Sequence, residues 1–299
     1  ELYFMSSPSY AVLNEVVSLA PKKDRAFINA VLRQVSSRQL QQPHDPSISC
    51  SMPEWIIRLW NAHYGECRCN QLLQIFQTPA GVYGRWNPIK AEKQQLSESN
   101  HYTWLDEWSF SSDIPIQKTR DFLNGRVVIQ NPSSLLPVMM MDVKPGMKVL
   151  DTCASPGTKT QMMAVLMENT GSITACDLYE HRLSLIDHLM EKTGVKIVET
   201  MVADGTKLAQ EHVESFDRVL CDVPCSGLGD LRHKPEIRWH LTPDDMDEII
   251  LIQQQILQTS SCYVRNGGKL VYSTCTLNNR ENGKQIRDFL KNHPEFELM

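Results

Sequence analysis

From about residue 127 onward, the chain alternates short apolar runs with longer segments of helical spacing. Five runs have the length and composition of strands that are buried on both faces of a parallel sheet. The predicted strands span residues 148–151, 172–177, 196–204, 217–222 and 268–273. The predicted helices between and after them span residues 159–167, 181–192, 244–263 and 281–292. This alternation predicts a doubly wound α/β sheet, in which ligands bind at the carboxyl ends of the strands.

Acidic residues stand at four of these five strand ends, and the fifth strand runs into Cys275. The four are Asp151, Asp177, Asp204 and Asp222. A single Asp in such a place is more often a cap or turn residue than a ligand. Because the carboxyl ends of parallel strands meet at one edge, the shared position favours a common ligand site. There Asp177 is expected to accept hydrogen bonds from a ribose diol, and Asp204 to meet an adenine ring.

The loop after the first predicted strand consists mainly of small residues and opens a helix. Its members are Cys153, Ala154, Ser155, Pro156, Gly157, Thr158 and Lys159. Such a loop lets a ligand lie close to the backbone amides at the helix N-terminus. The spacing matches neither Gly-x-Gly-x-x-Gly nor Gly-x-x-x-x-Gly-Lys-Ser/Thr, which disfavours a dinucleotide and a nucleoside triphosphate.

Two of the nine cysteines stand at adjacent strand ends. Pro224 and Gly227 predict a tight turn that presents Cys225, and Cys275 follows the last predicted strand. Beside a nucleoside site, this pair favours covalent catalysis in which a thiolate attacks an electron-poor carbon. The alternative is a buried structural thiol. We prefer that alternative for Cys50, Cys176, Cys221 and Cys262.

The cysteines are expected to be reduced, because a chain of 299 residues does not need disulfides to stabilise it. Cys67 and Cys69 lie close in sequence to His63. Since no second pair of ligands follows at the spacing of a zinc site, we expect no metal.

The first part of the chain predicts helices joined by a polar linker. Residues 1–5 resemble the remnant of an expression tag. Asp24 is expected to cap a helix over residues 25–33, and residues 39–51 predict the linker. Pro53 then opens a second helix. Its apolar face comprises Trp55, Ile56, Leu59 and Trp60.

Residues 78–125 have an irregular pattern that predicts a small α+β region. Its aromatic side chains could stack on nucleic-acid bases, but we interpret them as core. They are Tyr83, Trp86, Trp104, Trp108 and Phe110.

Composition limits the class of partner. The formal net charge of −5 excludes a chain that coats nucleic acid by bulk charge, although a local basic groove stays compatible with it. No apolar run approaches the roughly 20 residues of a membrane span. With no secretory signal visible, the chain is expected in the cytoplasm, as a monomer.

The motifs of the second half resemble those of the RsmB-type (Fmu/Sun) family of RNA cytosine-5 methyltransferases, which is related to the NOL1/NOP2/Sun group. Residues 151–160 are similar to its Asp-x-Cys-Ala-x-Pro-Gly-Gly-Lys-Thr signature, and residues 222–227 to its Asp-x-Pro-Cys-Ser-Gly. Residues 273–276 resemble its Ser-Thr-Cys segment. Further matches are residues 125–137, 230–239 and, to the last helix of a NusB-like RNA-binding domain, 25–33.

The resemblance implies methylation of carbon 5 of a cytosine in small-subunit (16S) ribosomal RNA, with S-adenosylmethionine bound by the loop residues, Asp177, Asp204 and Asp222. In such an enzyme Cys275 adds to carbon 6 of the base, and Cys225 helps to release it. Asp222 would bond near the base or the cofactor amine, and these two roles stay open. Lys159 either supports the site electrostatically or forms a plain salt bridge.

The resemblance also implies a Rossmann-like S-adenosylmethionine-dependent methyltransferase sheet with three parts. These are a NusB-like helical remnant at 1–42, a small linking region at 43–124 and a catalytic domain at 125–299. Two further strands are expected beyond Met299, so the chain is expected to be a fragment. Thr158 stands where the family has the second Gly of the loop.

A basic stretch follows the Pro-Cys turn and forms either a phosphate-binding patch or a solvated loop. Its residues are Arg232, His233, Lys234 and Arg238.

Other functions stay open at this point. A DNA cytosine methyltransferase would use Cys225 as nucleophile and leave Cys275 idle, and a transfer RNA substrate would suit the same site. A nucleotide-dependent oxidoreductase lacks its glycine fingerprint here. A non-catalytic RNA-binding assembly factor would bind RNA and cofactor without methyl transfer.

Overall fold

The computed structural model describes residues 7–38 and 43–299. The chain forms two compact units, Glu1–Met52 and Pro53–Met299, which we treat separately. The predicted tag remnant at residues 1–5 and the first four residues of the predicted linker lie outside the described residues.

The first unit consists of short helices. They are α1 (Ser9–Leu19), α2 (Arg25–Ser36) and α3 (Pro46–Ser49). The Arg25 side chain donates hydrogen bonds to the carbonyls of Ser18 and Ala20, which fixes the connection between α1 and α2. The predicted cap is wrong, because Asp24 has helical backbone angles and its side chain makes no capping hydrogen bond.

The second unit begins with α4 (Glu54–Ile75), which follows Pro53 as predicted. Ile56 and Trp60 are buried, and Trp55 and Leu59 are partly buried. The helix is kinked at Gly65, where φ is +78°.

A small antiparallel sheet follows α4, with strand order β2-β3-β1-β4. Its strands are β1 (Tyr83–Trp86), β2 (Tyr102–Trp104), β3 (Ser109–Ser112) and β4 (Val127–Ile129), and α5 (Arg120–Leu123) precedes β4. Phe110 is buried in a cluster against which Trp86 and Trp104 pack, and Trp108 packs against the core beside the parallel sheet, which confirms these four as core. Tyr83 is half-buried and outside these clusters, so its interpretation as core is wrong.

The third part is a parallel sheet of strand order β7-β6-β5-β8-β9. Its strands are β5 (Lys148–Asp151), β6 (Ser172–Asp177), β7 (Val198–Val202), β8 (Phe216–Asp222) and β9 (Val264–Ser273). Its helices are α6 (Leu135–Met141), α7 (Thr158–Leu166), α8 (Glu180–Thr193), α9 (Ile237–His240), α10 (Pro243–Ser261) and α11 (Gly283–Asn292).

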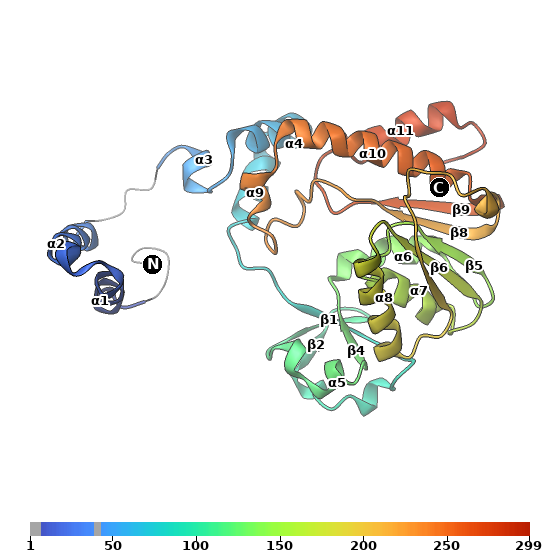
Figure 1. The fold of residues 1–299 in the computed structure, drawn as a ribbon, viewed down its shortest axis with the longest axis horizontal. Helices are drawn as coiled ribbons and strands as arrows, with labels where there is room; N and C mark the ends of the chain where they lie inside the picture. The colour runs from blue at the N-terminus through green and yellow to red at the C-terminus, as the bar shows by residue number, and fades with distance from the viewer. Residues whose placement is uncertain (1–6, 39–42) are drawn as a thin grey trace. The chain divides into compact units, whose positions relative to one another are not determined.

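Helices cover both faces of this sheet (Figure 1). On one face, Val149 and Ile173 join the core of α6, α7 and α8. On the other face, Cys221 packs against Ile256 of α10. Successive strand residues thus point to opposite faces of the sheet, and each face packs against apolar side chains of the helices. The predicted doubly wound, Rossmann-like fold is confirmed.

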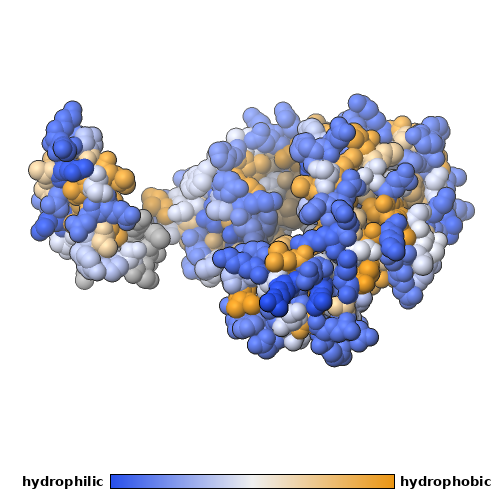
Figure 2. All heavy atoms as spheres, turned by 60° about the horizontal axis from the view of Figure 1, so that its bottom comes forward, coloured by the Kyte–Doolittle hydropathy of each residue, from blue (hydrophilic) through white to orange (hydrophobic). Residues whose placement is uncertain are grey.

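The predicted domain boundaries at residues 42 and 124 stay predictions. Strand β4 follows the second boundary and pairs with β1 of the small sheet. Within the described ranges, none of the helices combines the length and the apolar composition of a membrane span. On the face shown in Figure 2, hydrophobic residues form scattered patches among hydrophilic ones.

Candidate active site

The carboxyl ends of the parallel strands bring the predicted acidic residues to one edge. Asp151, Asp177 and Asp222 are the last residues of β5, β6 and β8. Asp222 lies opposite Ser273 of β9 in the ladder. Asp204 comes two residues after β7 ends.

The loop between β5 and α7 depends on Gly157, which precedes the first residue of the helix with φ at +96°. A Cβ atom there would approach Cγ2 of Ile186 to 3.2 Å. Thr158, the departure from the family pattern, is the first residue of α7, where a side chain is compatible with the backbone. Cys153 is half-buried, and burial raises the pKa of its thiol.

Asp151 is a buried carboxylate with few donors. Its Oδ2 accepts a hydrogen bond of 2.7 Å from the Thr160 hydroxyl, whereas Oδ1 is buried without a partner in the described part of the chain. Burial raises the pKa of Asp151 to about 7, against the opposing effect of Thr160. The side chain therefore keeps its proton to a higher pH than an ordinary carboxyl does.

Lys159 of α7 and Asp222 at the end of β8 form an ion pair, with Nζ 2.6 Å from Oδ2. The Ser273 hydroxyl donates to the other oxygen of Asp222 at 2.5 Å. The structure thus shows the salt bridge that was one of two alternatives for Lys159. Lys159 of α7 and Ser273 of β9 together fix the orientation of the Asp222 carboxylate.

Asp177 and Asp204 have different surroundings. Asp177 is buried and accepts from the Tyr179 amide at 3.3 Å, with Arg182 also at 3.3 Å. Asp204 accepts from the Thr206 hydroxyl at 2.6 Å and from the Thr206 amide at 3.1 Å. These bonds lower the pKa of Asp204, whose role as a turn residue is therefore evident in the structure.

Cys225 and Cys275 are in contact, with their sulfur atoms 3.2 Å apart. The Cys275 amide also donates to the Cys225 sulfur at 3.3 Å. Cys275 is exposed and Cys225 is partly buried. Either sulfur can be the donor in this contact. With the Cys225 thiol as donor, the hydrogen bond raises the pKa of Cys225 and lowers that of Cys275, which favours the thiolate at Cys275.

Of the four cysteines interpreted as buried, three are buried and one is not. Cys50, Cys176 and Cys221 are buried. Cys262 is partly exposed at the end of α10, where its thiol donates to the Gln258 carbonyl at 3.6 Å. The interpretation of Cys262 as a buried thiol is wrong, because its helix position faces the edge of the core.

The predicted basic patch is partly wrong. Arg238 is only 8% exposed and donates to the Phe76 carbonyl at 2.9 Å, so it is neither a phosphate ligand nor part of a solvated loop. His233 and Lys234 lie 2.9 and 3.4 Å from the Asp230 carboxylate. Arg232 Nε donates to the Thr78 carbonyl at 3.2 Å.

A hollow of about 210 Å³ adjoins this loop. It is lined by Ala80, Gly81, Tyr83, Leu105, Asn131, Pro132, Arg232 and His233. The loop starts beside Cys275, because the Gly229 amide donates to the Cys275 carbonyl at 3.0 Å. Arg232 and His233, which line the hollow, thus follow within four residues of Gly229, whose amide is hydrogen-bonded to Cys275.

Several buried charged residues carry no sequence signal, and two of them lie near the candidate site. Arg85 of β1 is fully buried, and its Nε donates to Gln130 at 2.6 Å. Its Nη2 contacts Gln161 of α7, so it links the small sheet to the helix after the loop. Burial lowers the pKa of Arg85 to about 9. Glu281 is fully buried behind the cysteine turns. Neither has a sequence signal beyond being charged in a structured segment.

The candidate ligands Cys67 and Cys69 point to different environments, the first exposed and the second buried. The imidazole of His63 accepts from the Asn279 amide at 3.4 Å. In residues 7–38 and 43–299, no three His, Cys, Asp or Glu side chains are grouped closely enough to hold a metal ion.

Comparisons with known proteins agree with this geometry. A family model described as 16S rRNA methyltransferase RsmB/F matches residues 138–299. The probable ribosomal RNA small subunit methyltransferase B of Bacillus subtilis is 33% identical, over 99% of this chain and 70% of its own. The 25S rRNA (cytosine-C(5))-methyltransferase nop2 of Schizosaccharomyces pombe is 30% identical, over 82% of this chain and 46% of its own.

A solved structure shares the fold. The methyltransferase homolog protein from Pyrococcus horikoshii superposes with a TM-score of 0.73 and is 29% identical, over 83% of this chain and 81% of its own. With the strand-end carboxylates and the paired cysteines in place, the chain belongs to the 16S rRNA methyltransferase RsmB/F family and is a methyltransferase with S-adenosylmethionine as its cofactor.

Proposed function

We propose that the chain methylates carbon 5 of a cytosine in 16S ribosomal RNA through a covalent adduct with Cys275. The observation that carries this proposal is the contact between Cys225 and Cys275 at two adjacent strand ends, with 3.2 Å between the sulfurs. The names of the relatives support the substrate, since one is a small-subunit RNA methyltransferase and another acts on cytosine C5 of ribosomal RNA. Cytoplasmic location and a monomeric state stay predictions.

The residues at the strand ends fit the cofactor. The buried Asp177 carboxylate suits a ribose diol, and Asp204 follows two residues after the end of β7, the strand that pairs with β6. The first amides of α7 lack intrahelical acceptors and favour a negatively charged group. The loop residues Cys153, Ala154, Ser155, Pro156, Gly157, Thr158 and Lys159, with Asp222, would complete the site. When bound, S-adenosylmethionine supplies an electrophilic methyl group.

Cys275 would perform the first covalent step. Its sulfur adds as thiolate to carbon 6 of cytosine, which makes carbon 5 electron-rich enough to be methylated. The carbon 5 proton then passes to water, its electron pair restores the 5,6 double bond, and the bond between carbon 6 and sulfur breaks to release Cys275. Cys225 keeps its proton and donates to the Cys275 sulfur, so it stabilises the departing thiolate. Asp222, fixed by Lys159 and Ser273, presents an acceptor at the same edge.

The target base must leave its stack to reach this edge, which favours a cytosine in a loop or single strand. The hollow beside the basic loop suits contacts to the neighbouring nucleotides. Its lining includes the aromatic ring of Tyr83 and the side chains of Arg232 and His233. Such groups stack on bases and attract phosphates.

The two cysteines can be tested separately. Cys275→Ala is expected to abolish turnover and adduct formation, whereas Cys225→Ala is expected to accumulate a covalent RNA adduct on denaturing gels. Cys67→Ala, an exposed cysteine outside the site, serves as the control. If Cys225→Ala prevented any adduct, Cys225 would be the nucleophile, as in DNA cytosine methyltransferases. Bisulfite mapping of 16S RNA with and without the gene would identify the cytosine or exclude this substrate.

A further inference from the structure

Glu281 occupies a position that the proposed chemistry does not use. It is fully buried, and its carboxylate accepts bonds from uncharged donors on three segments. The Ser226 amide donates at 2.9 Å and the Ser226 hydroxyl at 2.5 Å. Gln253 of α10 and Asn278 each donate at 2.9 Å through their side-chain amides. A buried acceptor with this many donors favours one fixed geometry.

These donors flank Cys225 on both sides. Ser226 follows Cys225 directly, and Gln253 also donates to the carbonyl of Pro224, which precedes Cys225, at 3.0 Å. The Glu281 carboxylate and the Gln253 amide therefore hold the backbone before and after this cysteine.

The same cluster reaches the Cys275 turn. The Thr276 hydroxyl lies 2.7 Å from that of Ser226, so a chain of hydroxyls connects the residues that follow the two cysteines. Asn282, next to Glu281, accepts from the Thr274 hydroxyl at 2.6 Å and donates to the Thr276 carbonyl at 3.0 Å. Thr274 and Thr276, the two neighbours of Cys275, are thus both hydrogen-bonded to Asn282.

We infer that Glu281 is a positioning residue that joins the Cys225 and Cys275 turns and so keeps the Cys225 thiol within hydrogen-bonding distance of the Cys275 sulfur. A carboxylate suits this place because every group around it donates. In Glu281→Gln the new amide N–H would face a donor, and the turns would have to separate. The effect on turnover rests on the proposed function, whereas the effect on the two sulfurs does not.

The test measures the Cys275 thiolate directly. Alkylation of Cys275 by iodoacetamide, followed by mass spectrometry of its peptide over a range of pH, reports the thiolate fraction. For Glu281→Gln we expect the midpoint to move up by about one pH unit, which slows alkylation about tenfold near neutral pH. The charged groups facing Cys275, which stay in both proteins, are Asp222, Asp230 and Lys234.

Turnover should fall together with the thiolate fraction of Cys275. We expect kcat of Glu281→Gln to drop about 100-fold while KM for RNA stays within about threefold, because the reacting atoms are misplaced and not the RNA surface. Glu248→Gln is the matched control, an exposed glutamate on α10 with the same substitution. It should match the parent in both measurements.

An unchanged alkylation profile in folded Glu281→Gln would overturn the inference, even if turnover fell. Absence of methylation by the parent would contradict the proposed function, and the alkylation result would remain valid. If Glu281→Gln does not fold, Ser226→Ala removes one donor and the link to Thr276. It should shift the profile in the same direction by a smaller amount, and an unshifted profile there would equally contradict the inference.

Discussion

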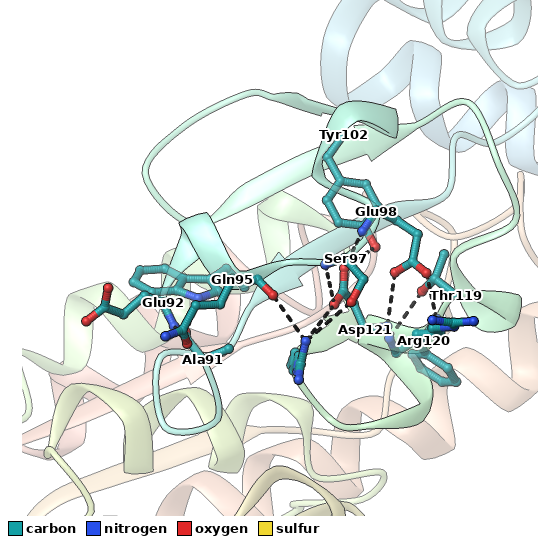
Figure 3. Close-up of polar contacts among 12 residues, drawn as sticks. Ala91, Glu92, Gln95, Ser97, Glu98, Tyr102, Thr119, Arg120 and Asp121 are labelled. Atoms are coloured by element: carbon teal, nitrogen blue, oxygen red, sulfur yellow. Dashed lines mark hydrogen bonds and ion pairs between the residues drawn. The ribbon is translucent and has the colours of Figure 1, made fainter.

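Asp121 on α5, beside the small antiparallel sheet, and Asp151 at the edge of the parallel sheet are both buried, but they are bonded differently. Asp121 accepts from the amides of Ser97 at 2.9 Å and Glu98 at 3.0 Å and from the Tyr102 hydroxyl at 3.2 Å. Figure 3 shows these groups turned toward it. Asp151 accepts from one hydroxyl and leaves an oxygen unpartnered within the described residues.

The electrostatic result has opposite signs in the two regions. Burial tends to raise the pKa of Asp121, but the Glu98 and Ser97 amides outweigh it and hold the pKa below its usual value. For Asp151, burial dominates and raises the pKa to about 7. The small sheet is therefore built around a satisfied charge, whereas the catalytic edge keeps one that is costly to ionise. Unsatisfied, perturbed groups are typical of ligand sites.

The largest effect should come from Asp222→Asn at the catalytic edge. It removes the charge that pairs with Lys159 and changes the acceptor for Ser273. We expect methylation to fall about 1000-fold, or about 4 kcal/mol of transition-state stabilisation, with little change in unfolding. Steady-state kinetics and thermal unfolding measure the two. Asp288→Asn, on α11 away from the site, is the control and should change neither methylation nor unfolding. A large loss of stability in Asp222→Asn would contradict the division between the two regions.

The pH dependence of stability should also separate the regions. The pKa of Asp151 is about 7 in the folded chain and about 3.9 in the unfolded chain. The contribution of its protonated side chain to the free energy of unfolding is therefore lost as pH rises between these values. Asp151→Asn should therefore gain stability relative to the parent between pH 4 and pH 8, by on the order of 4 kcal/mol. Urea unfolding at both pH values tests this.

Asp121 should show the reverse dependence. Because its folded pKa is lowered, its contribution is present above the unfolded pKa and is lost as pH falls through the folded value. The free energy of unfolding of Asp121→Asn should therefore be closest to that of the parent at acidic pH. If both variants changed with pH in the same direction, the comparison of the two carboxylates would be wrong.

Removing the Asp121 side chain should cost stability and leave the chemistry intact. Asp121→Ala strands two amide donors and the Tyr102 hydroxyl in a buried place, and we expect a loss of about 3 kcal/mol. Methylation per folded molecule should stay within about twofold of the parent. Asp113→Ala in the same region, an exposed residue paired with His101, is the control and should be close to neutral.

The sequence predicted the parts that depend on local pattern. Residues 148–151 and 172–177 match β5 and β6 at both ends, because buried parallel strands are continuous apolar runs. The contact of Cys225 with Cys275 follows from their places at adjacent strand ends. The burial of Arg238 and Glu281 could not be predicted, because their partners lie on segments far away in the sequence. Charged residues are usually exposed, and only tertiary contacts reverse this.

The smallest effect sharpens the comparison inside the catalytic region. Gly157→Ala and Gly146→Ala both place a side chain at positive φ, at +96° and +84°. At Gly146 the new Cβ meets nothing within 4 Å, whereas at Gly157 it approaches Ile186 to 3.2 Å. Both should lose about 1 kcal/mol from backbone strain. Only Gly157→Ala should also weaken S-adenosylmethionine binding, since only there must the loop shift. Equal affinity in the two variants, measured by calorimetry, would show that the loop tolerates the contact and that its geometry is set elsewhere.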